Sequence, residues 1–135
     1  MTDPDLVAKK LAFIETCVRE LRTLARPERI VEDRREERFV EHTLQIAIQA
    51  ALDVGSHIVS DERLGEPATS RDVFRLLGRG GVITVDLTAR LEQMVGFRNV
   101  VVHGYHDVDL GIVRDVVENR LDDLLEFAAV VRRRV

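Results

Sequence analysis

Four polar residues stand close together in an otherwise apolar segment, residues 94–105, and their types are those that bind anions and exchange protons. They are Arg98, Asn99, His103 and Tyr105, the only tyrosine of the chain. An arginine side chain carries a permanent positive charge, and histidine is the side chain that titrates nearest neutral pH. A lone tyrosine is more often a partly buried packing residue. The cluster raises the question of how an apolar helix positions these groups.

Arg98 falls in the middle of an apolar stripe, because the residues on its helix face at about 100° per residue are hydrophobic. These are Leu87, Leu91, Met94 and Val101. A guanidinium buried there without a partner would be costly. Asp53 is the natural partner, since it interrupts an apolar run on the preceding long helix. Composition alone leaves two interpretations open: an ion pair that joins two helices, or a catalytic role for Arg98.

The opposite side of the same helix mixes small, apolar and polar residues, namely Gly96, Asn99, Val100 and His103. This pattern suggests that a second helix packs there, and in so short a chain that helix can belong to another copy of the protein. Arg98 and His103 diverge by about 140° on a regular helix. Either the helix ends before His103, with Gly104 as its cap, or one site combines two chains.

A polar line also runs along the preceding long helix, and its default interpretation is a solvent-facing stripe. It consists of His42, Gln45, Gln49, Asp53, Ser56 and Ser60. If the line borders a cleft instead, Asp53 or His57 could hold the residues of the site in position. A lone histidine such as His57 is, however, more often structural. No grouping has the spacing of metal ligands, and no serine sits in a nucleophile elbow.

The elements that must position these residues are predicted to be helices throughout. Expected helices run from Asp3 to a break at Pro27, from residues 28–32 to 59 or beyond, over residues 71–77, from Thr84, and from Asp109 to about residue 131. No segment alternates like a strand. We therefore expect an all-α fold, an up-and-down four-helix bundle plus one short extra helix, in a single domain of residues 1–135.

Composition narrows the class of protein further. The chain has 135 residues, 45% of them hydrophobic and 33% charged, which is typical of a soluble globular protein. No signal peptide, no membrane-spanning run and a lone Cys17 indicate a cytoplasmic protein. The net charge of −4 argues against a protein that coats nucleic acid nonspecifically. Five phenylalanines, one tyrosine and no tryptophan offer no obvious platform for stacking bases.

Within this helical framework, the residues Arg98-Asn99-x3-His103-x-Tyr105 resemble the motif of HEPN ribonucleases, in the form found in HepT toxins. The resemblance extends to other segments in the same order along the chain. They are VEHTLQIAIQAALDVGSHIV at residues 40–59, GVI at 81–83, MVGFRN at 94–99 and VD at 108–109. An arginine and a histidine at this spacing would be weak evidence alone, but the surrounding segments make the resemblance fairly specific.

The resemblance implies a homodimeric, metal-independent endoribonuclease without a cofactor, whose two motifs meet in a cleft between subunits. Arg98 would bind the scissile phosphate and stabilise the charge that develops on it. His103 would act as general acid or base for attack by the neighbouring 2′-hydroxyl, so that the substrate is RNA. Asn99 would orient the phosphate or the histidine.

The resemblance also implies a partner and a means of control. HepT toxins act in type VII-like toxin–antitoxin systems with a minimal nucleotidyltransferase (MNT) antitoxin, which in related systems silences the toxin by transferring AMP to the motif tyrosine. Here that residue is Tyr105. The added phosphate would bring negative charge and bulk to the place where RNA must enter. No membrane partner is implied.

Two alternatives belong to other functional classes. In the first, the chain is a non-catalytic subunit that presents a substrate or nucleotide to a nucleotidyltransferase, and His103 transfers no proton. In the second, the chain is a purely structural helical dimer, which leaves the clustering of Arg98, Asn99, His103 and Tyr105 unexplained. Toxicity on expression without the partner separates the ribonuclease from the binding subunit.

Overall fold

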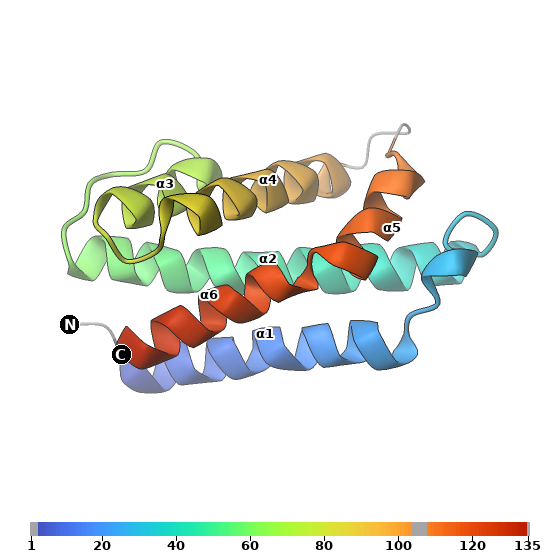
Figure 1. Ribbon diagram of the computed structural model, residues 1–135, viewed down its shortest axis with the longest axis horizontal. Helices are drawn as coiled ribbons and strands as arrows, with labels where there is room; N and C mark the ends of the chain where they lie inside the picture. The colour runs from blue at the N-terminus through green and yellow to red at the C-terminus, as the bar shows by residue number, and fades with distance from the viewer. Residues whose placement is uncertain (1–2, 104–107, 135) are drawn as a thin grey trace.

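A computed structural model describes residues 3–103 and 108–134, and these residues form helices joined by short loops (Figure 1). The elements are α1 (Pro4–Leu24), the short 3₁₀ helix η1 (Pro27–Arg29), α2 (Arg34–Asp61), α3 (Ser70–Arg79), α4 (Val85–Val102), α5 (Leu110–Asn119) and α6 (Leu121–Arg134). No strand occurs in the described part of the chain, which confirms the predicted all-α class. No helix there is long and apolar enough to cross a membrane.

Local capping residues determine where most helices begin, as the sequence predicts. The Asp3 carboxylate accepts hydrogen bonds from the N–H groups of the first turn of α1. At the start of α3 the Asp72 carboxylate accepts from the N–H of Thr69 at 3.1 Å. Thr84 and Asp109 cap α4 and α5 in the same way. These caps satisfy N–H groups that the helices cannot bond internally.

Two helix boundaries differ from the prediction. The second long helix starts at Arg34 with Asp33 as its cap, after η1 takes up the residues that follow Pro27. The last predicted helix is divided into α5 and α6 at Arg120, whose φ of −117° departs from the α-helical value. Neither proline nor glycine marks this break, and the apolar spacing continues from Val116 to Leu124, so the sequence predicts one continuous helix there.

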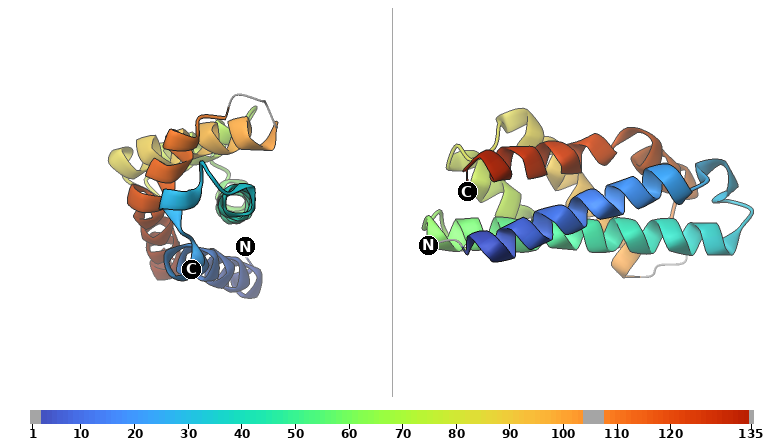
Figure 2. Two further views of the ribbon diagram at one scale, coloured as in Figure 1. Left: turned by 90° about the vertical axis from the view of Figure 1, so that its right-hand side faces the viewer. Right: turned by 90° about the horizontal axis from the view of Figure 1, so that it is seen from below.

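Helix α2 is the centre of the molecule and packs against α1, α3, α4, α5 and α6. The end-on view in Figure 2 shows α1, α4 and α6 arranged around it. Gly55 lets α3 approach closely, since a Cβ atom at this position would lie 2.8 Å from Cγ1 of Val73. The ring of Phe74, also on α3, meets Phe127 of α6 edge to face, with ring centroids 5.5 Å apart.

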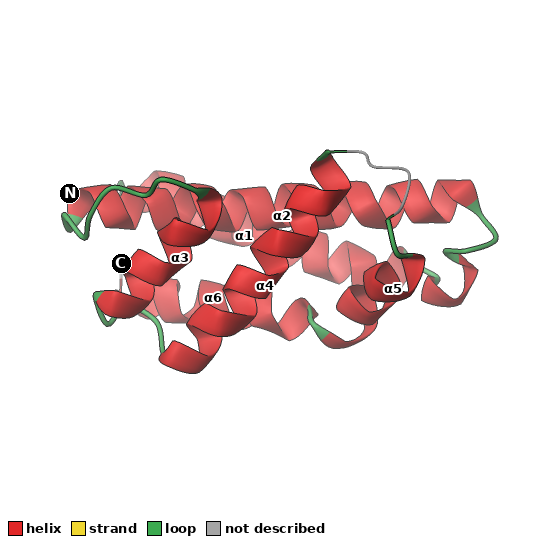
Figure 3. Cartoon of the chain, turned by 90° about the horizontal axis from the view of Figure 1, so that it is seen from above, coloured by secondary structure: helices red, strands yellow, loops and turns green. Residues whose placement is uncertain are grey.

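Helix α4 crosses the bundle obliquely, and its C-terminal half passes over α2 (Figure 3). Its buried residues Leu87, Leu91, Met94 and Val95 anchor it to the core. The first half of α4 is also tied to α6 by Arg90, which pairs with the buried Asp123 at 2.6 Å. This anchoring leaves the second half of α4, with Arg98 and Asn99, between α2 and solvent.

Loss of Arg90 is expected to destabilise the fold, because it would leave Asp123, only 6% exposed, without its cation. Arg90→Ala should lower the free energy of unfolding by about 2–3 kcal/mol in urea denaturation. The control is Asp86→Ala, which removes an exposed partner of the same arginine and should cost less than about 0.5 kcal/mol. Equal losses in the two variants would contradict the stabilising role of the Arg90–Asp123 pair.

Candidate active site

Arg98 is held between α4 and α2 by two amide side chains. Its Nη1 donates to Oδ1 of Asn99 at 2.7 Å, and its Nη2 donates to Oε1 of Gln49 on α2. The side chain is half-buried. Both acceptors are neutral, and among the described residues no carboxylate forms an ion pair with Arg98. The guanidinium is therefore fixed in position while its positive charge is not neutralised.

One donor of this guanidinium has no acceptor. The Nε atom of Arg98 is buried and has no hydrogen-bond partner in the described part of the chain. A buried charged donor without an acceptor is unfavourable. An oxyanion would reach the guanidinium through its Nη groups, since each donates one N–H to an amide oxygen and carries a second N–H. The position of Arg98 is thus one that favours binding of an anion.

The predicted ion pair between Arg98 and Asp53 is not formed. Asp53 instead accepts a hydrogen bond from Nε2 of Gln49 at 2.9 Å and pairs with Lys10 of α1 at 3.0 Å. By binding the amide nitrogen of Gln49, Asp53 leaves the amide oxygen to face Arg98. The carboxylate is thus connected to the guanidinium only through Gln49, which lies one turn before Asp53 on α2.

Gln49 and Lys10 are the residues of this network that sequence reasoning missed. The signal for Gln49 was present, since it precedes Asp53 by four positions on the same polar line, the spacing of side chains that meet on a helix. Lys10 lies 43 residues from Asp53 in sequence. Only the packing of α1 against α2 brings these two charges together.

His103 caps the C-terminus of α4, and its side chain is exposed. The helix ends at Val102, but His103 keeps a φ of −75°, which is close to the helical value. Its N–H also donates to the carbonyl oxygen of Asn99 at 3.2 Å. The end of the helix therefore does not bring His103 round to Arg98, and the two side chains leave α4 in different directions, separated by about 140°.

The remaining predicted site residues lie apart from this network or outside the described residues. His57 is exposed on α2, two turns beyond Gln49, or about 12 Å along the helix axis. The hydrogen bonds of the Arg98 network do not involve it. Tyr105 lies outside the residues that the structure describes. In those residues no group of three histidine, cysteine or acidic side chains could hold a metal ion.

A shallow groove between α1 and α2 lies directly beside the Arg98 network. It has a volume of about 410 Å³, and Gln49 and Asp53 form part of its wall. Lys9 adds a positive charge to it, Lys10 is paired there with Asp53, and Phe13, 42% exposed, adds an aromatic ring. The positive charge beside Arg98 is thus extended along the surface even though the chain as a whole is acidic.

Comparison with known proteins gives a match over most of the chain. A family described as HepT-like ribonucleases matches residues 14–131. The mRNA nuclease HepT of Shewanella oneidensis is 33% identical over 129 residues, which are 95% of this chain and 97% of that protein. The tRNA nuclease HepT of Aphanizomenon flos-aquae is 35% identical over 71 residues, 53% of this chain and 48% of its own length.

Solved structures agree with these sequence matches. The tri-AMPylated HEPN toxin of Shewanella oneidensis, in complex with its MNT antitoxin, superposes with a TM-score of 0.90 at 32% identity. The match covers 97% of this chain and 99% of that one. YutE, a cytosolic protein of Bacillus subtilis, shares the fold with a TM-score of 0.87 at only 18% identity.

Removal of the Gln49 amide is expected to leave both of its partners, Arg98 and Asp53, with one hydrogen bond fewer. Gln49→Leu should lower the free energy of unfolding by about 1–2 kcal/mol, because Nη2 of Arg98 loses its acceptor. Combining it with Arg98→Leu should cost less than the sum of the single changes. Gln45→Leu, one turn earlier on the same polar line, is the control, and both variants can be compared by urea denaturation. Additive costs would show that the two side chains are not coupled.

Proposed function

The chain belongs to the HepT-like ribonucleases, and on this premise we propose that it is the toxin of a HepT/MNT pair and cleaves RNA with Arg98, Asn99 and His103. The observation that supports this assignment best is the state of Arg98. A guanidinium held by two neutral amide oxygens, and paired with no carboxylate among the described residues, is suited to a phosphodiester. A structural arginine would more often be paired with a carboxylate.

Arg98 binds the scissile phosphate and stabilises the negative charge that grows on its oxygens during attack. Its position is set before the substrate arrives, because Asn99 and Gln49 hold two of its nitrogens. Preorganised donors of this kind lower the barrier without reorganisation during the reaction. Asn99 has a positioning role, since its amide oxygen is bonded to Arg98.

His103 exchanges protons with the ribose and the leaving group. As base it takes the proton of the 2′-hydroxyl while the 2′-oxygen attacks phosphorus and the bond to the 5′-oxygen breaks. As acid a histidine gives a proton to that 5′-oxygen, so that the products are a cyclic phosphate and a 5′-hydroxyl end. No metal ion is needed to balance this reaction, and DNA is excluded because it lacks the 2′-hydroxyl.

The working site combines two copies of the chain. Arg98 faces α2 while His103 is exposed at the end of α4, so a single chain turns the two groups apart. A twofold dimer would place two Arg98 and two His103 side chains around one cleft. It would also supply one histidine as base and the other as acid.

An MNT-type nucleotidyltransferase controls the activity by modifying Tyr105. The phenolic oxygen attacks the α-phosphorus of ATP, pyrophosphate leaves, and AMP remains on the tyrosine. The Shewanella oneidensis relative, which is tri-AMPylated and bound to its MNT antitoxin, supports this mode of control. Tyr105 follows His103 by two positions, so the added phosphate competes with RNA for the site.

Substitution of either motif residue is expected to abolish cleavage. Arg98→Ala and His103→Ala should each lower the rate of RNA cleavage about 100-fold or more. Activity of the unsubstituted chain should survive a metal chelator. His42→Ala changes an exposed histidine of α2 away from the network and is the control. Full activity of both motif variants would overturn the catalytic assignment, and an inactive wild-type chain would favour the non-catalytic subunit.

Modification of Tyr105 is expected to be visible by intact-mass measurement. Co-expression with a nucleotidyltransferase of the MNT type should add AMP to the chain and suppress cleavage, and Tyr105→Phe should abolish the first AMP addition. If the chain loses activity in the complex without gaining mass, the inhibition is steric and the proposed control by AMP transfer is wrong.

A further inference from the structure

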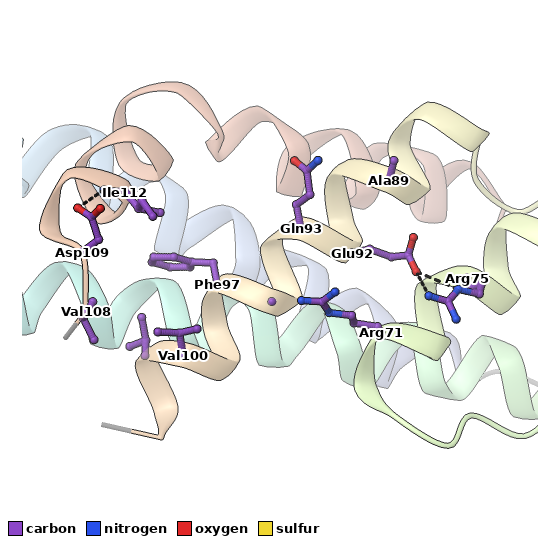
Figure 4. A pocket seen from close by; sticks show the side chains of 12 residues that line it. Arg71, Arg75, Ala89, Glu92, Gln93, Phe97, Val100, Val108, Asp109 and Ile112 are labelled. Atoms are coloured by element: carbon purple, nitrogen blue, oxygen red, sulfur yellow. Dashed lines mark hydrogen bonds and ion pairs between the residues drawn. The ribbon is translucent and has the colours of Figure 1, made fainter. Parts of the chain in front are cut away.

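A second groove, larger than the one beside Arg98, lies on the opposite face of α4. It has a volume of about 670 Å³ and is bounded by α3, α4 and the start of α5 (Figure 4). Pockets of this size accommodate small organic ligands, including nucleotides. The Arg98 network accounts for none of its lining residues, so the groove requires its own explanation.

Arg71 of α3 supplies a positive charge to this groove, and Gly96 of α4 makes its position possible. A Cβ atom on Gly96 would overlap Nη2 of Arg71 and lie 3.2 Å from its Cζ atom. Figure 4 shows the guanidinium reaching the α4 ribbon. The sequence suggests that Gly96 admits a second helix, but in the structure it admits this side chain. A glycine within a helix costs about 1 kcal/mol relative to alanine, and here it creates space for a cation.

The charge of Arg71 is not neutralised, in contrast to the other charges of the groove. Arg75 pairs with both Asp72 and Glu92, at 3.2 and 2.9 Å. Asp109 caps α5 by accepting from the N–H of Gly111 at 2.8 Å. Among the described residues no carboxylate pairs with Arg71. The groove therefore presents one cation that has no ion-pair partner among the described residues.

The remainder of the groove is apolar. Phe97 and Val100 of α4 face Ile112 of α5 across it, and the last two are 46% and 52% exposed. Figure 4 shows the ring of Phe97 extending towards α5. An aromatic ring beside a cation is the combination that binds the base and the phosphate of a nucleotide. The structure thus supplies the stacking surface that composition alone did not indicate.

The groove leads towards the candidate catalytic histidine. Gly96, Val100 and His103 follow one another at positions i, i+4 and i+7, which lie on one face of α4. His103 is only about 4.5 Å beyond Val100 along the helix axis. A nucleotide in the groove would therefore lie next to the end of α4 from which His103 acts.

We propose that this groove is a subsite for a nucleotide of the RNA substrate flanking the cleaved bond, with its phosphate on Arg71 and its base against Phe97. The inference rests on the proposed ribonuclease function and adds a residue that selects substrate. A long RNA gains this contact, while a substrate too short to reach the groove does not. Arg71 acts in binding and takes no part in proton transfer.

The test measures binding and not cleavage, so that it does not depend on the catalytic residues. The probe is a fluorescent single-stranded oligonucleotide of 2′-O-methyl RNA, which lacks the attacking hydroxyl, and the readout is fluorescence anisotropy. Arg71→Ala should weaken binding about tenfold, the effect of one lost hydrogen bond between charged groups. It should also reduce the slope of log affinity against log salt by about 0.7, as expected for one lost phosphate contact.

The matched control is Arg79→Ala, which changes another exposed arginine of α3 outside the groove. Gly96→Ala should weaken binding like Arg71→Ala, because the new methyl group displaces the guanidinium. In the Arg71→Ala background the same glycine change should have no further effect. If the effect of Gly96→Ala requires Arg71, the glycine change acts by displacing the Arg71 side chain. General damage to α4 is not the cause, because alanine favours the helix more than glycine does.

Two results would overturn the subsite. The first is equal affinity and equal salt slope for the unsubstituted chain and Arg71→Ala. The second is conversion of a dimer to a monomer by Val100→Asp in sedimentation velocity, which would show that a second copy covers the groove. Weaker RNA binding by Val100→Asp at unchanged oligomeric state would support the subsite. Cleavage that survives Arg98→Ala and His103→Ala would overturn the catalytic assignment while the binding results stand.

Discussion

The contact between Arg98 of α4 and Gln49 of α2 determines where the positive charge of the candidate site lies. Gln49 is itself oriented by Asp53, which is paired with Lys10, so three helices fix one guanidinium. A carboxylate in the place of Gln49 would hold Arg98 equally well but would cancel its charge. The amide of Gln49 both holds Arg98 in position and preserves its charge. Its neutral oxygen accepts the hydrogen bond and leaves the cation available to an anion.

A second arginine is held in position on the other face of α4, but by a different means. Arg71 is positioned by space that Gly96 leaves open, and again no described carboxylate pairs with it. Many other arginines of this acidic chain are bound to aspartate or glutamate, as Arg90 and Arg132 are. An acidic protein can therefore bind RNA if a few cations near the site stay uncompensated while the others are paired away from it.

Much of the fold follows from local signals that the sequence carries. Asp3, Thr69, Thr84 and Asp109 begin helices where capping chemistry predicts, and the apolar spacing of α4 identifies its buried face correctly. The break between α5 and α6 has no such signal. The φ of Arg120 departs from the α-helical value although the apolar pattern runs on through it, so the direction of each helix depends on the surfaces against which it packs.

The sequence by itself determined the helical class and the motif of Arg98, Asn99 and His103, because helix caps and helix faces depend on residues at most a few positions apart. It left open whether the end of the helix turns His103 towards Arg98 or whether one site combines two chains. Only the tertiary structure decided that Gln49, and not Asp53, holds Arg98, and that Gly96 receives Arg71. Those contacts join residues on different helices, and which side chains meet there depends on how the helices cross, a consequence of packing the whole core.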